Sequence, residues 1–184
     1  MVTKRDGSKE PISLDKITNR VSVLSTGLNI DPIVVVQKAV PGLYSDISSV
    51  EIDTYLAETA AALTVEHPDY SYLAARIKVN SLHKETPGFI IATKNLYDDG
   101  LLREDYYKKV MENADLIESV IDYDKDYTFD YFALTTLIRA YLLKFDNKTI
   151  ERPQDLWMRV TLTVTGNEFN LDKIKETYKS LSTG

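Results

Sequence analysis

The sequence contains no cysteine, and only His67 and His83 among its 184 residues are histidines. Without cysteine a chain forms no disulfide and no thiolate metal site, and it carries no thiol redox chemistry. Two histidines are too few for a histidine-rich metal centre. We therefore expect no metal site in this chain.

Basic charge and long apolar runs are also scarce. The 22 basic against 28 acidic residues give a formal net charge of −6. This balance argues against a general nucleic-acid binder, which would present a basic face. No apolar run is long enough to span a bilayer, and the first residues show no signal-peptide pattern. These absences predict a soluble, cytoplasmic protein without nucleic-acid or membrane partners, with room for one or two small domains.

The first residues predict a β-hairpin. Asp6-Gly7 is a two-residue turn signal, because both central residues of a type I′ turn need positive φ, which Asp tolerates and Gly adopts freely. Extended arms at residues 2–4 and 9–12 flank this turn. Pro11 cannot donate a ladder hydrogen bond, so the second arm lies at an edge of the sheet or leaves it.

A helix start follows the hairpin, with Ser13 or Asp15 as its N-cap. Free backbone N–H groups at a helix start favour an anion, and basic side chains of a flap can close over it. The basic residues available are Lys4, Arg5 and Lys9 on the hairpin and Lys16 in the first helical turn. Taken alone, a basic hairpin before a helix is more often a solvated surface feature than a ligand site.

Three more helices are predicted before Pro87. Asp31-Pro32 is a typical N-cap and first helical position for a helix over 33–40. Ser48 and Glu51 have the spacing of a capping box for a helix over 50–64, with Asp53 expected away from its apolar face. A fourth helix opens at residues 67–69. One hairpin and four helices amount to one small domain.

Three separated runs in this region carry a family resemblance. They are K-R-D-G-S-x-E-x-I-x-x-D-K-I from Lys4, S-S-V-E-I-D-T from Ser48, and H-P-D-Y-x-x-L-A-A-R-I-x-V-x-x-L-H-K-E-T from His67. Together they resemble the ATP-cone, the nucleotide-binding regulatory domain at the N-terminus of class I ribonucleotide reductase large subunits. The resemblance implies a mainly α (α+β) fold, with a β-hairpin flap on a four-helix bundle at 1–86.

The resemblance also implies a set of nucleotide-binding residues. Lys4 and Arg5 match hairpin contacts to the nucleotide, and Lys16 and Lys84 would meet the phosphates as compact charges. Ser49 and Asp53 match positions on the third helix, where a carboxylate could sense the 2′-hydroxyl that separates ATP from dATP. The segment expected around base and ribose consists of Glu10, Pro11, Ile12, Ser13, Leu14, Asp15 and Lys16.

Several of these residues also have a purely structural interpretation. Asp53 could favour the helix N-terminus through the helix dipole, and Lys84 could be a favourable cation in a last turn. Arg20 could reach the phosphates or pair with an acid. His83 is more typical of a packed histidine than of a ligand, and Glu51 is interpreted as a capping residue.

The second region, 87–184, is predicted to be helical with one short hairpin. Helices are expected over 89–97, 101–113 and 114–121, and Asp146-Asn147 turns the hairpin. Between the last of these helices and the hairpin, aromatic and acidic residues alternate over 123–127. This run is interpreted either as a binding face or as core aromatic residues beneath a solvated acidic rim. Trp157, Val160 and Val164 are expected on the core face of the penultimate helix. The region resembles the family's helical segment that precedes its catalytic barrel.

The family's chemistry needs a radical-bearing cysteine and a redox cysteine pair on a ten-stranded barrel. Because this chain has neither, we expect no nucleotide reduction by this stretch alone, although it would belong to an oxidoreductase. It is either an N-terminal fragment of a longer large subunit, which its last residues favour, or a naturally short regulator.

The resemblance implies ATP or dATP as an allosteric effector with Mg²⁺. The implied partners are other large subunits and the radical-generating small subunit of deoxyribonucleotide synthesis. The alternatives are a helical interaction module with a vestigial nucleotide site, or an ATP-cone transcriptional repressor. Those repressors carry a cysteine zinc ribbon, which is absent here.

Overall fold

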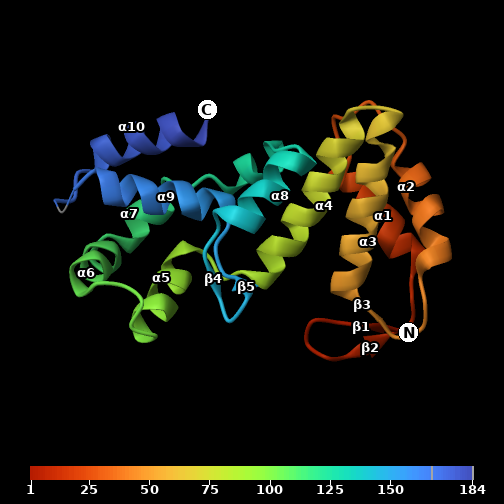
Figure 1. Ribbon diagram of the computed structural model, residues 1–184, viewed down its shortest axis with the longest axis horizontal. Helices are drawn as coiled ribbons and strands as arrows, with labels where there is room; N and C mark the ends of the chain where they lie inside the picture. Colours follow the sequence, from red (N-terminus) through yellow and green to blue (C-terminus); the bar gives the residue numbers. More distant parts are fainter. Residues whose placement is uncertain (167, 184) are drawn as a thin grey trace. The chain divides into compact units, whose positions relative to one another are not determined.

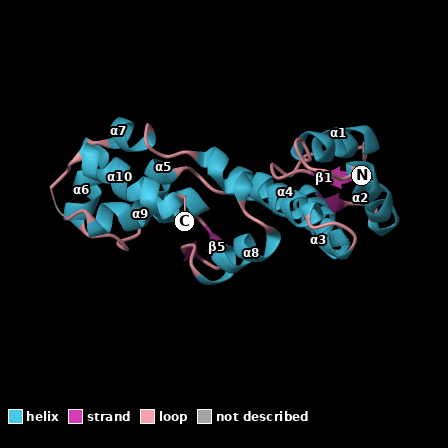
Figure 2. Ribbon diagram, turned by 90° about the horizontal axis from the view of Figure 1, so that it is seen from above, coloured by secondary structure: helices cyan, strands magenta, loops and turns pink. Residues whose placement is uncertain are grey.

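The computed structural model describes residues 1–166 and 168–183, which are mainly helical with a few short strands (Figure 1, Figure 2). The chain forms two compact units. Unit 1 contains Met1–Ser81 and Tyr127–Thr135, and unit 2 contains Leu82–Asp126 and Thr136–Gly184. The domain boundary expected between residues 86 and 87 stays a prediction, because compact units and domains need not share their limits.

Unit 1 contains a three-stranded sheet. Strand β1 (Val2–Thr3) pairs antiparallel with β2 (Lys9–Glu10) and parallel with β3 (Ile47–Ser48), so β1 is central. Val2 lies opposite Ile47, and both side chains are buried. The sequence analysis did not anticipate β3, because two residues are too few for an alternating pattern.

The hairpin turn differs from the type I′ turn that the sequence predicted. Gly7 has positive φ (82°), whereas Asp6 does not. The Gly7 N–H donates to the Lys4 carbonyl (3.0 Å), and the Lys4 N–H donates to the Ser8 carbonyl (2.8 Å). The Asp6 carboxylate accepts the Ser8 N–H at 2.9 Å and so acts as a local turn acceptor. The turn is therefore a longer loop with one left-handed glycine.

Three helices of unit 1 begin at caps that the sequence predicted, and of the two candidates for α1 the structure selects Ser13. The Ser13 hydroxyl accepts the Lys16 N–H, Asp31 accepts the Ile33 N–H, and Ser48 forms a capping box with Glu51. Each cap of this kind stabilises a helix by about 1 kcal/mol. The elements that lie wholly or partly in unit 1 are α1 (Leu14–Leu24), α2 (Pro32–Ala39), η1 (Val40–Gly42), α3 (Ser49–Ala62), η2 (Leu63–Val65) and α4 (Asp69–Glu85).

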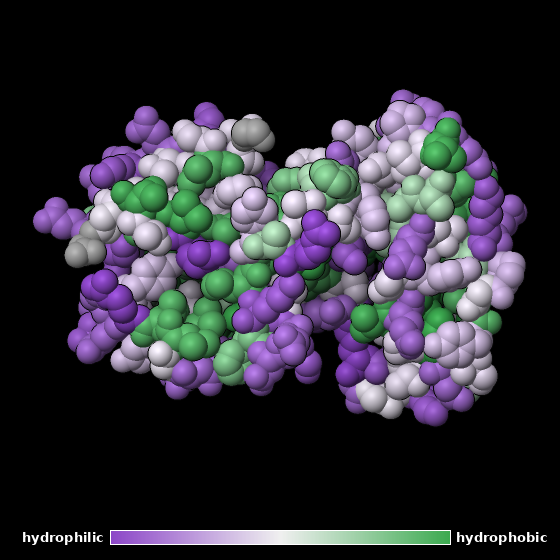
Figure 3. Space-filling model, in the orientation of Figure 1, coloured by the Kyte–Doolittle hydropathy of each residue, from purple (hydrophilic) through white to green (hydrophobic). Residues whose placement is uncertain are grey.

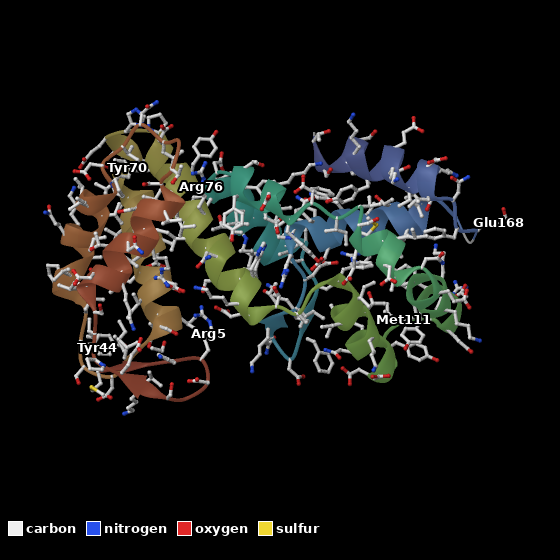
Figure 4. The ribbon with its side chains drawn as sticks, turned by 180° about the vertical axis from the view of Figure 1, so that it is seen from behind. Arg5, Tyr44, Tyr70, Arg76, Met111 and Glu168 are labelled. Atoms are coloured by element: carbon white, nitrogen blue, oxygen red, sulfur yellow. The ribbon has the colours of Figure 1, made fainter. Side chains whose placement is uncertain are left out.

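The core of unit 1 brings these helices together around small residues. Ala57 and Ala60 of α3 are buried beside larger apolar side chains, and small residues let helices approach closely. Tyr131 packs against this core, and its N–H donates to Ser71 Oγ at 3.1 Å. Arg76, labelled in Figure 4, donates to the carbonyls of Leu24 (2.9 Å), Thr26 (2.8 Å) and Tyr127 (3.3 Å). These contacts bind residues 127–135 to unit 1.

The remaining elements lie wholly or partly in unit 2. Asp146 (φ 47°) and Asn147 (φ 61°) both have positive φ, which confirms the predicted two-residue hairpin. Helices α6 and α7 are shorter than expected. The elements are α5 (Phe89–Asp98), α6 (Glu104–Glu112), α7 (Ala114–Glu118), η3 (Tyr123–Thr128), α8 (Tyr131–Ala140), β4 (Lys144–Phe145), β5 (Lys148–Thr149), α9 (Pro153–Val164) and α10 (Leu171–Ser182).

The buried face of α9 differs from the predicted one. Val164 is 62% exposed, and Trp157 and Val160 are only partly buried, whereas Met158 and Leu162 are fully buried. Helix α9 is contacted on more than one side, so a single apolar stripe did not describe its core face.

Buried polar groups connect η3 to α9. Asp126 is fully buried, and its carboxylate lies 2.7 Å from His83 Nε2 and accepts the Gln154 N–H at 3.1 Å. The Tyr123 hydroxyl donates to Asp155 Oδ1 at 2.6 Å. Burial raises the pKa values of both carboxyls, that of Asp155 to about 6. The acidic-aromatic run is therefore largely structural. No helix within the described residues is both long and apolar enough to cross a membrane.

Candidate functional site

A cavity of about 200 Å³ in unit 1 collects half of the predicted nucleotide-binding residues. It lies between the hairpin, the start of α1 and the start of α3. The predicted residues that line it are Glu10, Pro11, Ser13, Lys16, Ser49 and Asp53, and the additional lining residues are Val2, Ile17, Arg20 and Ile52.

Two helix starts line the cavity. Strand β3 leads directly into α3, whereas β2 leads into α1 through residues 11–13. The two strands lie on either side of β1 and run antiparallel to each other, so the segment 11–13 brings the start of α1 to the cavity. Ser13, the N-cap of α1, and Ser49, the first residue of α3, both belong to the lining. Backbone N–H groups at a helix start carry a partial positive charge that favours an anion, so the cavity can stabilise a negatively charged ligand.

Asp53 is the buried centre of an ion-pair cluster. Its side chain is 2% exposed, Arg5 Nη2 lies 3.1 Å from Oδ2, and Arg20 pairs with Oδ1. Arg5, labelled in Figure 4, also donates to Ser81 Oγ (2.7 Å) and Ser49 Oγ (3.5 Å). The expectation that Asp53 lies away from the buried face is wrong. Two guanidinium groups compensate the buried carboxylate, which would otherwise be costly.

A second, more exposed cluster lies at the rim of the cavity. Lys4 Nζ lies 2.8 Å and Lys16 Nζ 3.2 Å from the same oxygen of Glu10. The hydrogen bond from Lys4 lowers the pKa of Glu10, and the same bond raises the pKa of Lys4. The Lys16 side chain is 71% exposed, so a ligand can reach it.

The two clusters gather basic side chains at the cavity. Four of them, Lys4, Arg5, Lys16 and Arg20, form ion pairs with the two acids Glu10 and Asp53. In a chain of net charge −6, this is a local concentration of cations. Together with the two helix starts, it suits a polyanion such as a triphosphate.

The other predicted residues do not line the cavity. Ile12 packs against the core of unit 1, and Leu14 is 45% exposed at the first position of α1. Asp15 follows in the same helical turn. Lys84 lies in the last turn of α4, within unit 2. Lys4 and Arg5 do not line it either, but they pair with the lining residues Glu10 and Asp53. The role of all twelve residues in nucleotide binding stays a prediction.

Sequence reasoning missed the apolar part of the lining. Ile17 and Ile52 line the cavity and also belong to or pack against the core of unit 1. Arg20, left open between phosphate and acid, pairs with Asp53. Arg20 follows Lys16 by one helical turn, and this spacing was the signal in the sequence that could have placed it at the site. Among the described residues, no group of three or more acidic or histidine side chains could hold a metal ion.

Two profiles of known protein families match this chain. The profile of the ATP cone domain matches residues 1–85, and that of the ribonucleotide reductase all-alpha domain matches residues 127–184. These two matches cover most of the chain, which therefore belongs to the ribonucleotide reductase large-subunit family, as a stretch with its ATP cone and part of its all-alpha domain.

Individual relatives agree with this assignment. The chain is 41% identical to ribonucleoside-diphosphate reductase large chain 2 of Saccharomyces cerevisiae over 98% of its own length and 22% of that protein. It is 41% identical to the large subunit of Caenorhabditis elegans and 42% identical to that of Dictyostelium discoideum, again over 98% of its length. It spans 24% and 22% of those two proteins, respectively.

Proposed function

We propose that unit 1 binds ATP or dATP as an allosteric effector, and that this chain is the regulatory portion of a ribonucleoside-diphosphate reductase large subunit. The observation that carries the proposal is the concentration of Lys4, Arg5, Lys16 and Arg20 around a cavity at two helix starts. The match of residues 1–85 to the ATP cone supports the same ligand class.

The cavity accepts only part of a nucleotide as it stands. Its volume of about 200 Å³ lies below the roughly 300–1,000 Å³ typical of ligand pockets. Binding therefore requires side chains at the rim to move. The exposed pairs of Lys4 and Lys16 with Glu10 are the least costly to break, because solvent already screens them. The phosphates then replace Glu10 as the partner of the two lysines.

The apolar lining suits the base and the ribose. Ile17 and Ile52 present apolar surface, while the backbone from Ile12 to Leu14 offers hydrogen-bonding groups to the adenine edge. Mg²⁺ enters with the triphosphate as its counter-ion. Asp53 lines the cavity and can distinguish a ribose from a deoxyribose, provided that Arg5 or Arg20 releases one of its oxygens.

Regulation follows from the connection of Asp53 to the hairpin. A phosphate that competes for Arg5 or Arg20 changes how the hairpin is held against α3, and this alters the face that unit 1 presents. An effector shifts such an equilibrium only by its difference in affinity for the two states, typically about 1–3 kcal/mol. In the whole enzyme this shift controls association of large subunits with each other and with the radical-generating small subunit. The chain itself contributes no cysteine chemistry.

The direct test is calorimetric titration of the 184-residue chain with ATP and with dATP in the presence of Mg²⁺. We expect saturable binding that Lys16→Ala weakens about tenfold, because one charged hydrogen bond to a phosphate is lost. The control is Lys38→Ala, which removes an exposed lysine paired with Glu66 away from the cavity. Absence of heat with both nucleotides would instead favour the interaction module with a vestigial site.

A further inference from the structure

Unit 2 contains a second and larger cavity, of about 430 Å³, which the regulatory function does not use. It lies between the start of α6 and the second half of α9. Its apolar lining comes from Leu101, Leu102 and Leu162, and its polar lining from Arg103, Asp105, Tyr106, Lys109, Arg159 and Thr163. The volume is within the range of about 300–1,000 Å³ in which small ligands bind.

Lys109 is a half-buried cation without a carboxylate partner. Its ammonium group donates to the carbonyl oxygens of Leu162 (2.6 Å) and Gly166 (2.8 Å), and within the described part of the chain it forms no ion pair. Burial lowers its pKa, because the charged form is desolvated. Since an ammonium group has three donors, one remains for a ligand.

The other two cations of the lining are already neutralised. Arg159 binds Glu151 through two hydrogen bonds, of 2.7 and 3.1 Å. Arg103 binds Asp105 in the same way, at 3.1 and 2.6 Å. The uncompensated charge of the cavity is therefore that of Lys109.

Tyr106 supplies a second unused donor on the same wall. Its hydroxyl is buried and has no hydrogen-bond partner among the described residues. A buried hydroxyl without a partner costs about 1–3 kcal/mol, which an acceptor in the cavity would recover. The Tyr106 ring centroid lies 5.7 Å from Lys109 Nζ, so the two side chains are neighbours.

We propose that this cavity binds a small carboxylate with an apolar body, such as an arylalkanoate. The carboxylate accepts a hydrogen bond from Lys109 and, once the buried Tyr106 hydroxyl opens to the cavity, a second one from Tyr106. The apolar body covers Leu101 and Leu102, while Leu162 is already fully buried. A single negative charge matches the single uncompensated cation, whereas a polyphosphate would find the two arginines already occupied. Figure 3 shows hydrophobic residues among hydrophilic ones on one face of unit 2.

The test is titration of the full chain with phenylacetate, followed by amide chemical shifts. A ligand of this size binds with a Kd of about 1 mM when each heavy atom contributes a typical ~0.4 kcal/mol. We expect saturable shifts at residues 101–109 and 159–163. The neutral analogue phenylacetamide should bind at least fivefold more weakly, and inorganic phosphate should not reproduce the shifts.

Matched variants assign the two donors. Lys109→Met keeps the apolar stem and should weaken phenylacetate at least fivefold, whereas Lys108→Met removes an exposed lysine paired with Glu104 and should change nothing. Since Lys109 also ties α6 to the end of α9, Lys109→Met requires a folding check by circular dichroism. Tyr106→Phe removes only an unpartnered hydroxyl, should leave the fold intact, and should weaken binding about threefold.

Three outcomes would overturn the proposal. The first is no saturable shift up to about 20 mM phenylacetate, twenty times the Kd expected for a ligand of this size. The second is equal affinity for phenylacetate and phenylacetamide, since it would remove the role of the charge. The third is unchanged binding in both Lys109→Met and Tyr106→Phe, since it would locate the ligand elsewhere.

Discussion

At the scale of single residues, buried charge is the main feature of both units. Asp53 in unit 1 is compensated by two arginines, whereas Asp155 in unit 2 is held by neutral donors, the Tyr123 hydroxyl and the Arg152 N–H. The two carboxylates therefore respond in opposite ways to the loss of their charge. Removal of the Asp53 charge takes the carboxylate away from two arginines, whereas removal of the Asp155 charge relieves a desolvation cost.

The first prediction concerns Asp53→Asn. The change leaves Arg5 and Arg20 without their carboxylate, and since both arginines are about one-quarter exposed, we expect a loss of about 2–3 kcal/mol, below the 3–5 kcal/mol of a fully buried pair. Urea unfolding measures the loss. The matched control is Asp46→Asn, which breaks an exposed pair with Lys9 at a left-handed position that Asn tolerates. Equal losses in the two variants would contradict the compensation argument.

The second prediction concerns the pH dependence contributed by Asp155. Its pKa is raised to about 6 in the folded protein and is near 3.9 in an unfolded chain. The folded state binds the proton more tightly, so this contribution to stability is complete below about pH 4 and is lost as the pH rises through about 6. The loss amounts to roughly 2–3 kcal/mol.

Asp155→Asn should abolish this contribution. The free energy of unfolding, measured between pH 4 and 6.5, should fall less steeply with rising pH in Asp155→Asn than in the wild type. Asp98→Asn, at an exposed position, is the control and should follow the wild-type slope. Parallel curves for all three proteins would show that Asp155 does not titrate as its burial implies.

At the scale of elements, caps and turns determine where the cavity residues stand. The capping box at the start of α3 holds Ser49 and Asp53 at the cavity. Ser48→Ala should destabilise unit 1 by about 1 kcal/mol, because the Glu51 N–H loses its acceptor. Thermal unfolding measures the effect. Ser180→Ala, on the exposed surface of α10, should shift the midpoint far less.

The hairpin turn gives the fourth prediction. Gly7 has φ of 82° with open space around its Cβ position, so Gly7→Ala introduces backbone strain without a steric clash. We expect a loss of about 1 kcal/mol and weaker ATP binding, because Lys4 and Arg5 flank the strained turn. Gly88→Ala, where φ is −76°, is the control. Unchanged affinity in Gly7→Ala would mean that the hairpin takes no part in binding.

At the scale of the whole molecule, the two units are expected to respond to different ligands. ATP at one hundred times its Kd should stabilise unit 1 by about 2.7 kcal/mol. Hydrogen exchange should then show added protection in β1, β2, α1 and the first turns of α3, and none in α6 or α9. Lys16→Ala should lose this protection at the same ATP concentration. Protection confined to unit 2 would contradict the assignment of the nucleotide to unit 1.

The fold could be predicted from the sequence wherever the signal is local. The N-caps Asp31 and Ser48 were predicted, and Ser13 was one of two candidates, because a cap depends on residues within one helical turn. The Asp146-Asn147 hairpin was predicted for the same reason. Asp6-Gly7 was assigned the wrong turn, because both two-residue and longer loops accept this dipeptide, and the choice depends on how the arms pair.

The sequence by itself determined the helical class, the helix starts, the family and the presence of cations near the first helix, because each depends on neighbouring residues or on a motif. Only the tertiary structure decided that Arg5 meets Asp53, that β3 completes the sheet, that residues 127–135 join unit 1, and that Lys109 and Tyr106 face one cavity. Arg5 and Asp53 are 48 residues apart. Contacts over such separations depend on how the whole core packs, which no local pattern encodes.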